Sequence, residues 1–370
     1  MSKPLSAVDC VSPAFARTKH QLFAPFRWGR WWRLALVCLL TGEGAGGGGG
    51  GPPVGNFNFP TSHGKGGGSL LALGQIPWGK ILPWLPWILA GVILLFSLIF
   101  LWVYIGSVFR FVLFDSVLHD RCQFKGSWTR WEPCGRSYFF WCLAFFVVSM
   151  MATGLLMGIP LLIAWRTGLF DHPGEHLAAL ILGGLAFLFL LAVFVVVAGV
   201  IALFAKDFCI PIMAMENVGV LKAWRRLLPM LAADKLAFAG YVLMKIVLAI
   251  AATIIVGITT LLIFLVLLIP LGIAALIIFF GGKAMGLTLD AATISILALF
   301  GGIILSAFIF LIALINTPPM VFFQSYVLHF IGSRYPAVGT VLFPPPAETS
   351  PHILEAPPII DLPPQSAPAG

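Results

Sequence analysis

Charged residues are scarce in this chain. Asp, Glu, Lys and Arg make up 10% of its 370 residues, whereas 60% are hydrophobic. A soluble domain carries about a quarter charged residues and could not hide this much apolar side chain from water. The shortage excludes an ordinary soluble enzyme and favours a protein embedded in a lipid bilayer.

Sequence motifs that carry chemistry are also missing. There is no G-x-S-x-G elbow, no H-E-x-x-H helix and no G-x-x-x-x-G-K-[ST] phosphate loop. Two small polar clusters remain, HPGEH (His172–His176) and the group of His119, Asp120 and Cys122. In the first, the intervening proline and glycine disfavour a regular pair of metal ligands on one helical face. We therefore expect no catalytic residues, no metal, no cofactor and no enzyme activity.

Paired cysteines are absent as well. The six cysteines are scattered and form no C-x-x-C pair. This spacing argues against a zinc framework or a dithiol redox centre, and it predicts free thiols. The six are Cys10, Cys38, Cys122, Cys134, Cys142 and Cys209.

Long hydrophobic runs dominate what is present. Each exceeds the roughly 20 residues that a helix needs to cross about 30 Å of hydrocarbon. They are Leu85–Phe109, Tyr138–Ala164, Leu177–Ala205, Ala237–Ile269 and Ala292–Ile315. The sequence predicts an all-α fold, a polytopic transmembrane helix bundle.

The distribution of basic residues predicts the orientation of this bundle. Lys and Arg number five in Arg110–Arg136 and five in Lys206–Lys235, but one in Arg166–His176. The positive-inside rule then places the first two loops in the cytoplasm. The N-terminus is also cytoplasmic if Trp28–Gly42 crosses the membrane, although this stretch reaches only about 22 Å. We expect a short first crossing there and about six crossings in all.

The fourth run is too long for one straight span once residues 270–282 are added. We expect Ala237–Ile269 to be one tilted span, broken at Pro270 and followed by a half-helix before Lys283. Two tight spans that turn at Ile258–Thr260 are the alternative.

Three spans are followed by aromatic-aliphatic stretches with a few polar residues: Ser107–Asp120, Lys206–Asn217 and Thr317–Phe330. They are too polar to span and too apolar for loops, which is typical of interfacial amphipathic helices. We call them the exit segments.

Basic elbows rich in Trp and Arg precede hydrophobic runs. These residue types prefer the head-group layer, so we predict that they anchor the chain at the interface. The chain would then contain a helix-pair unit that occurs three times. Each unit would consist of a basic elbow, a span that leaves the cytoplasmic side, a span that returns to it, and an exit segment. Alternatively, every cytoplasmic loop collects Trp, Arg and Phe for the same interfacial reason. The predicted anchors are Arg27, Trp31, Trp32, Arg33, Trp128, Arg130, Trp131, Trp224, Arg225 and Arg226.

The predicted domain organisation is simple. Residues 1–343 form a single transmembrane domain with a Gly-rich extracytoplasmic loop at 42–74. Residues 344–370 form a Pro-rich disordered tail, which is either inert or a docking strip for a membrane-protein partner. The net charge of +8 lies beside span ends, so we expect anionic lipid head groups as partners and no nucleic acid.

Lys245 is the one ionisable side chain predicted deep in a span, within GYVLMKIVLA (Gly240–Ala249). A lysine at the bilayer centre costs roughly 2.5–3.5 kcal/mol and usually faces protein or water. It either binds a lipid phosphate, an anionic substrate or a proton, or it snorkels or pairs with an exit segment.

Three stretches resemble an uncharacterised family of bacterial polytopic membrane proteins: Phe15–Val37, Asn56–Pro60 and Asp207–Leu227. That family is itself similar to the membrane domain fused to some glycerophosphodiester phosphodiesterases. The resemblance implies an all-helical bundle in the bacterial cytoplasmic (inner) membrane without an established activity, and the catalytic domain of those enzymes is absent here.

Two functional hypotheses follow. The first is a non-enzymatic scaffold or lipid-contacting subunit of unknown biochemical activity. The second is a transporter or lipid-handling carrier with a cavity near Lys245.

Overall fold

The computed structural model describes residues 4–24, 26–42, 83, 85–120, 126–168, 177–284 and 290–343, and all longer elements in these ranges are helices. The predictions for nearly all of the Gly-rich loop 42–74, for the tail 344–370, for the HPGEH cluster and for Cys122 lie outside the described residues. The helices are α1 (Val11–Phe23), α2 (Trp28–Leu40), α4 (Leu85–His119), α5 (Ser127–Arg166), α6 (Leu177–Phe204), the π-helix η3 (Ala205–Cys209), α7 (Ile210–Glu216), α8 (Val220–Ala233), α9 (Lys235–Ala284), α10 (Ala291–Gly332) and α11 (Pro336–Leu342).

Within the part of the chain that the structure describes, five helices are long and apolar enough to cross a membrane, as expected from the hydrophobic runs. They are Leu85–His119, Ser127–Arg166, Leu180–Glu216, Lys235–Ile273 and Ala298–Gly332. The chain is therefore a multi-pass membrane protein with an all-α structure.

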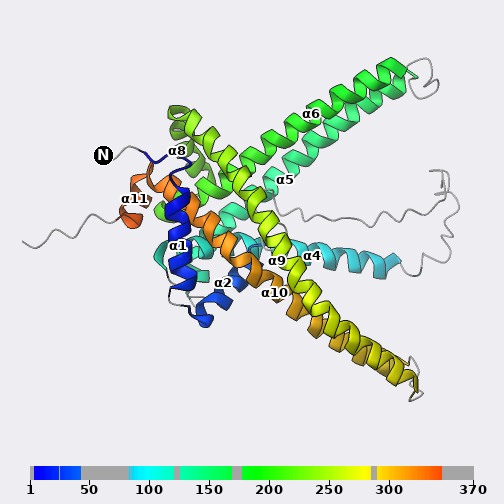
Figure 1. Cartoon of the computed structure of the whole chain (residues 1–370). Helices are drawn as coiled ribbons and strands as arrows, with labels where there is room; N and C mark the ends of the chain where they lie inside the picture. The colour runs from blue at the N-terminus through cyan, green and yellow to red at the C-terminus, as the bar shows by residue number, and fades with distance from the viewer. Residues whose placement is uncertain are drawn as a thin grey trace, which may run out of the picture.

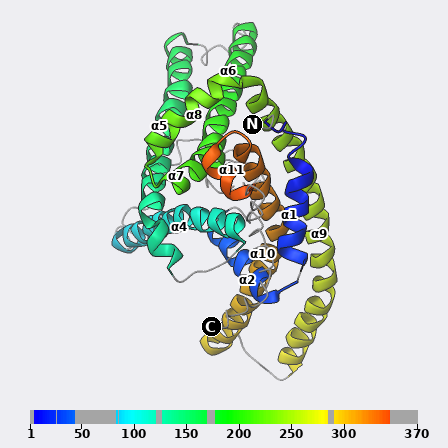
Figure 2. The same ribbon diagram turned by 90° about the vertical axis from the view of Figure 1, so that its left-hand side faces the viewer.

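The molecule has two regions, which we call the base and the arms (Figure 1). The base contains α1, α2, α7, α8, α11, η3 and the parts of the long helices that pack against them. The arms are residues 85–105 of α4, the hairpin of 140–166 with 177–201, and the hairpin of 246–284 with 291–312. Figure 1 shows the three arms leaving the base in diverging directions, and Figure 2 shows the base from its far side, with α1, α8 and α11 in front.

The hydrophobic core lies in the base. Its largest fully buried side chains include Tyr138, Phe111, Phe208, Leu227 and Phe330. The arms expose leucine, isoleucine, valine and phenylalanine along their length. Lipid tails are as apolar as these side chains, so a bilayer removes the cost that water would impose.

The structure corrects the prediction for the fourth run. α9 is one helix from Lys235 to Ala284, and Pro270 lies inside it. Both the predicted break at Pro270 and the alternative turn at Ile258–Thr260 are wrong. A proline removes one backbone hydrogen bond from a helix. In hydrocarbon, however, a break at the proline would leave further backbone groups without partners, because no water is present to bond to them, so the helix continues through Pro270.

The exit segments are also corrected. Each continues a long helix and is buried in the base, where Phe111, Phe208 and Tyr326 have 0% exposure. They do not lie on the surface of the protein by one apolar face. Aromatic-aliphatic stretches with a few polar residues suit a protein core as well as a membrane interface, so composition could not separate the two environments.

The short helix α2 lies beside one of these exit segments. Its start is tied to the end of α4 by the Arg30–Asp120 ion pair, at 3.2 Å. Near its end, the backbone oxygen of Leu40 lies 3.2 Å from where a Cβ on Gly106 would be. Therefore α2 runs antiparallel to residues 106–120. A sixth membrane crossing by α2 and the threefold repeat of the helix-pair unit remain predictions.

Candidate functional site

Lys245 lies at the root of the arms and is 4% exposed. Its ammonium forms an ion pair with the Asp207 carboxylate of η3. One helical turn earlier in α9, the Tyr241 hydroxyl donates a hydrogen bond to the same oxygen, Asp207 Oδ2, at 2.9 Å. Of the alternatives open from the sequence, pairing with an exit segment is the one confirmed.

The local sequence explains how these three groups meet. Tyr241 and Lys245 are four residues apart in α9, so they share one face of that helix. Asp207 lies in a π-helical turn that interrupts the continuous helix from α6 into α7. Such a turn inserts an extra residue and rotates the side chains that follow it. Asp207 is 4% exposed, so it is directed into the protein.

Aromatic rings surround the pair. The Tyr241 ring stacks on Tyr326, with centroids 5.3 Å apart and an interplanar angle of 10°. Its centroid also lies 4.6 Å from that of Phe330 and 4.9 Å from that of Phe208. These rings exclude water, which strengthens the attraction between the charges and raises the cost of leaving either one unpaired.

A second polar cluster closes the end of α4. Arg17 of α1 donates to the backbone oxygens of Val117 at 3.0 Å and Leu118 at 2.9 Å, and Gln21 donates to that of Ser116 at 3.2 Å. The last carbonyls of a helix lack intrahelical partners and carry partial negative charge, so a cation there is favourable. Burial lowers the pKa of the Arg17 guanidinium, but arginine stays charged at neutral pH.

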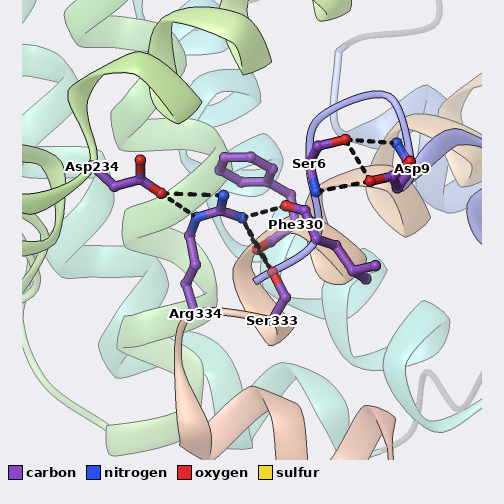
Figure 3. Close-up of polar contacts among 7 residues, drawn as sticks. Ser6, Asp9, Asp234, Phe330, Ser333 and Arg334 are labelled. Atoms are coloured by element: carbon purple, nitrogen blue, oxygen red, sulfur yellow. Dashed lines mark hydrogen bonds and ion pairs between the residues drawn. The ribbon is translucent and has the colours of Figure 1, made fainter. Parts of the chain in front are cut away.

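A third cluster gathers around Arg334, as Figure 3 shows. Its guanidinium donates to Asp234 Oδ2 from both Nε and Nη2 at 3.3 Å, and to the backbone oxygen of Leu5 at 3.0 Å. It also lies 4.0 Å from the centroid of the Phe330 ring. This one side chain joins the N-terminal segment, the α8–α9 junction and the end of α10.

Glu216 connects α7 to two further elements. It forms an ion pair with Arg226 of α8 and accepts a hydrogen bond from the hydroxyl of Tyr335, which precedes α11. Burial raises the pKa of Tyr335, and Arg226 partly offsets this rise. At neutral pH the phenol therefore stays protonated and can donate to the carboxylate.

The predicted anchors fall into two groups. The cations Arg27, Arg33, Arg130, Arg225 and Arg226 are exposed, together with Trp32.

The other anchor rings contribute to packing. Trp131 is buried and stacks on Phe111, with centroids 6.1 Å apart. Trp31 meets Phe23 edge-on at 5.2 Å, and Trp224 lies 6.4 Å from Trp141, again between centroids. Trp128 is half-buried. These four rings pack within the base, whereas Trp32 and the cations are exposed.

The described residues contain no group of three or more His, Cys, Asp and Glu that could hold a metal ion. Sequence reasoning missed Asp207, Arg17 and Arg334 as partners. The sequence offers two signals for this site. Asp207 is an acidic residue that follows a long apolar run, and Tyr241 and Lys245 are spaced one helical turn apart in the next run. These signals give no pairing, because 38 residues separate Asp207 from Lys245.

One family model matches the chain over residues 5–341, and its description reads "family of unknown function (DUF7544)". No curated protein and no solved structure matches the chain significantly. The match agrees with the resemblance to an uncharacterised family and provides no link to phosphodiesterases.

Proposed function

Since the chain belongs to the DUF7544 family of unknown function, which supplies no activity to carry over, we propose a function from the geometry. The protein is a non-enzymatic scaffold of the bacterial cytoplasmic membrane. Its base contacts anionic lipid head groups on the cytoplasmic side, and its three arms lie in the bilayer. The basic loops at the base support this orientation through the positive-inside rule.

The observation that carries this proposal is a contrast between exposed cations on the surface of the base and a buried ion pair in its interior. Cations such as Lys222 and Arg225 on α8 are exposed, beside the exposed apolar side chain of Leu221. The charges of Asp207 and Lys245, in contrast, are matched within the protein. Outward cations next to apolar side chains suit a head-group layer. Inward pairs that satisfy each other suit a structural role rather than catalysis.

A carrier is the second candidate. It is favoured by the position of the buried pair, where the α5–α6 and α9–α10 hairpins meet. An anionic lipid or solute would have to replace Asp207 as the partner of Lys245. In the double variant Asp207→Asn with Lys245→Met, both charges are removed. An anionic lipid that co-purifies with wild type and is lost from this folded double variant would favour the carrier.

The test of the scaffold proposal compares lipids. We expect wild type to melt at a higher temperature in nanodiscs that contain phosphatidylglycerol than in purely zwitterionic nanodiscs. Replacing Lys222 and Arg225 by Gln should reduce this difference while leaving the melting temperature in zwitterionic lipid unchanged. The matched control Lys222→Arg with Arg225→Lys keeps both charges and should keep the difference. Equal melting of wild type in the two lipids would refute the lipid contact.

Labelling from outside the cell tests the orientation and the six crossings. We expect a reporter at Glu175 to be labelled and a reporter at Lys222 to be protected, because the base is cytoplasmic. A labelled reporter at Gly48 would support a crossing in α2. Protection of Gly48 would mean that α2 remains with the base.

Two further predictions belong to this proposal. One is the likeness to the membrane domain of glycerophosphodiester phosphodiesterases, and the other is the threefold repeat of the helix-pair unit. Both rest on the pattern of basic elbows and exit segments.

A further inference from the structure

We propose that the Asp207–Lys245–Tyr241 contact is a latch that sets the angle between the α5–α6 arm and the α9–α10 arm. Asp207 follows the end of the first arm, in η3, and Tyr241 and Lys245 directly precede the start of the second arm, in α9. This inference is independent of the proposed lipid contacts.

The position of the contact supports this inference. Beyond it the two hairpins diverge, as Figure 1 shows. Side chains along both are exposed, including Leu188 and Phe189 of α6 and Ile254 and Leu261 of α9. Contacts between the hairpins are therefore concentrated at the root. A change there is amplified along the arms, because α9 extends about 48 Å from Lys245 to Ile277.

The energetics of a buried pair support a latch rather than simple reinforcement. Among the ion pairs of the described residues, this is the one whose two side chains are both almost fully buried, at 5% and 3%. The penalty for removing two charges from water largely offsets their attraction, so such a pair adds little net stability. Each charge is nevertheless very unfavourable without the other. The pair thus penalises every arrangement of the arms that separates Asp207 from Lys245.

The surrounding structure makes the contact directional. The π-helical turn fixes the rotation of Asp207 relative to α6. Tyr241 is held by its stacking on Tyr326, whose hydroxyl donates to the backbone oxygen of Ala7 at 3.0 Å. One carboxylate oxygen accepts from two groups one turn apart in α9, so it resists sliding of α9 along its own axis.

The experiment measures the distance between the arm ends. Spin-labelled unnatural amino acids replace Trp165 in α5 and Ile277 in α9, which are 76% and 67% exposed, in nanodiscs. Wild type should give one narrow distance distribution. Asp207→Asn with Lys245→Met should fold, because no charge is left unpaired, but should broaden the distribution or shift its mean. A rotation of about 10° at the root moves an end about 48 Å away by about 8 Å.

Two comparisons make the result decisive. Arg30→Met breaks the half-exposed Arg30–Asp120 pair of the base and should leave the distribution unchanged. Lys245→Met alone should destabilise the protein and, where it folds, broaden the distribution like the double variant. A wild-type distribution in the folded double variant would overturn the latch and leave the pair with a purely local role.

Discussion

Phe189 and Phe208 lie on the same continuous stretch of helix and have opposite surroundings. Phe189, in an arm, is 70% exposed, whereas Phe208, in the base, is 0% exposed. The residue type is the same, and both positions are helical, Phe189 in the α-helix α6 and Phe208 in the π-helical turn η3 that follows it. The two regions therefore differ in what covers their side chains: other side chains of the protein cover those of the base, whereas those of the arms are left open to the surroundings of the molecule.

Polar side chains show the same contrast. In the arms, the hydroxyls of Thr153, Thr253 and Ser306 bond to carbonyls of their own helices, three or four residues back. In the base, Arg17 and Arg334 bond to groups 100 or more residues away. These three hydroxyls are satisfied within their own helices, as hydrocarbon requires. Long-range specificity is concentrated in the base.

The largest effect that tests this contrast is a core truncation. Phe208→Ala should cost about 3–5 kcal/mol, because it leaves a cavity among Phe238, Tyr241 and Phe330. Phe189→Ala should change stability by less than about 0.5 kcal/mol, as at other exposed positions. Denaturant unfolding in lipid-containing micelles measures both. Equal losses would mean that Phe189 also packs against protein.

Removing the cap of α4 should have the next largest effect. Arg17→Ala leaves the carbonyls of Val117 and Leu118 without their charged donor and should cost about 1.5–3 kcal/mol. Lys19→Ala, on the exposed side of α1, is the matched control and should be neutral. Hydrogen exchange at the end of α4 should rise only in the first variant; unchanged protection there would rule out a capping role for Arg17.

A glycine pair in the base offers a steric test. A Cβ on Gly339 would lie 2.6 Å from the backbone oxygen of Gly332, so Gly339→Ala should displace α11 at a cost of about 1–3 kcal/mol. In the α10 arm, Gly301 has nothing within 4 Å of such a Cβ. Gly301→Ala should therefore be neutral or slightly stabilising. Limited proteolysis at α11 distinguishes the two, and equal resistance of both variants would contradict the close packing of α11.

The smallest effects concern single hydroxyl groups. Tyr326→Phe removes the hydrogen bond to Ala7 and should cost about 1 kcal/mol. Thr253→Val removes a bond to a carbonyl of its own helix, whose backbone partner remains, and should cost close to nothing. Thermal unfolding in the same nanodiscs compares them. A larger loss for Thr253→Val would show that arm hydroxyls also hold long-range contacts.

The arms could be predicted from the sequence because the length of an apolar run is a local property. The base could not, because the burial of Phe111 or Phe208 depends on segments far away in the chain. Lys245 illustrates the limit. Its isolation within its own span indicated that a partner must come from elsewhere, but nothing in the spacing selected Asp207. Pro270 shows a different limit, since a rule learned from helices in water predicted a break that hydrocarbon does not favour.

The contact between the start of the chain and α10 has a consequence for biosynthesis. The bonds from Tyr326 to Ala7 and from Arg334 to Leu5 join residues 319 and 329 positions apart. At roughly 5–20 residues per second, a ribosome completes the second partner about 16–65 seconds after the first. During that interval α1 has emerged without the helix end on which it packs. The arm helices can enter the bilayer one after another, but the base can close only after α10 has been made.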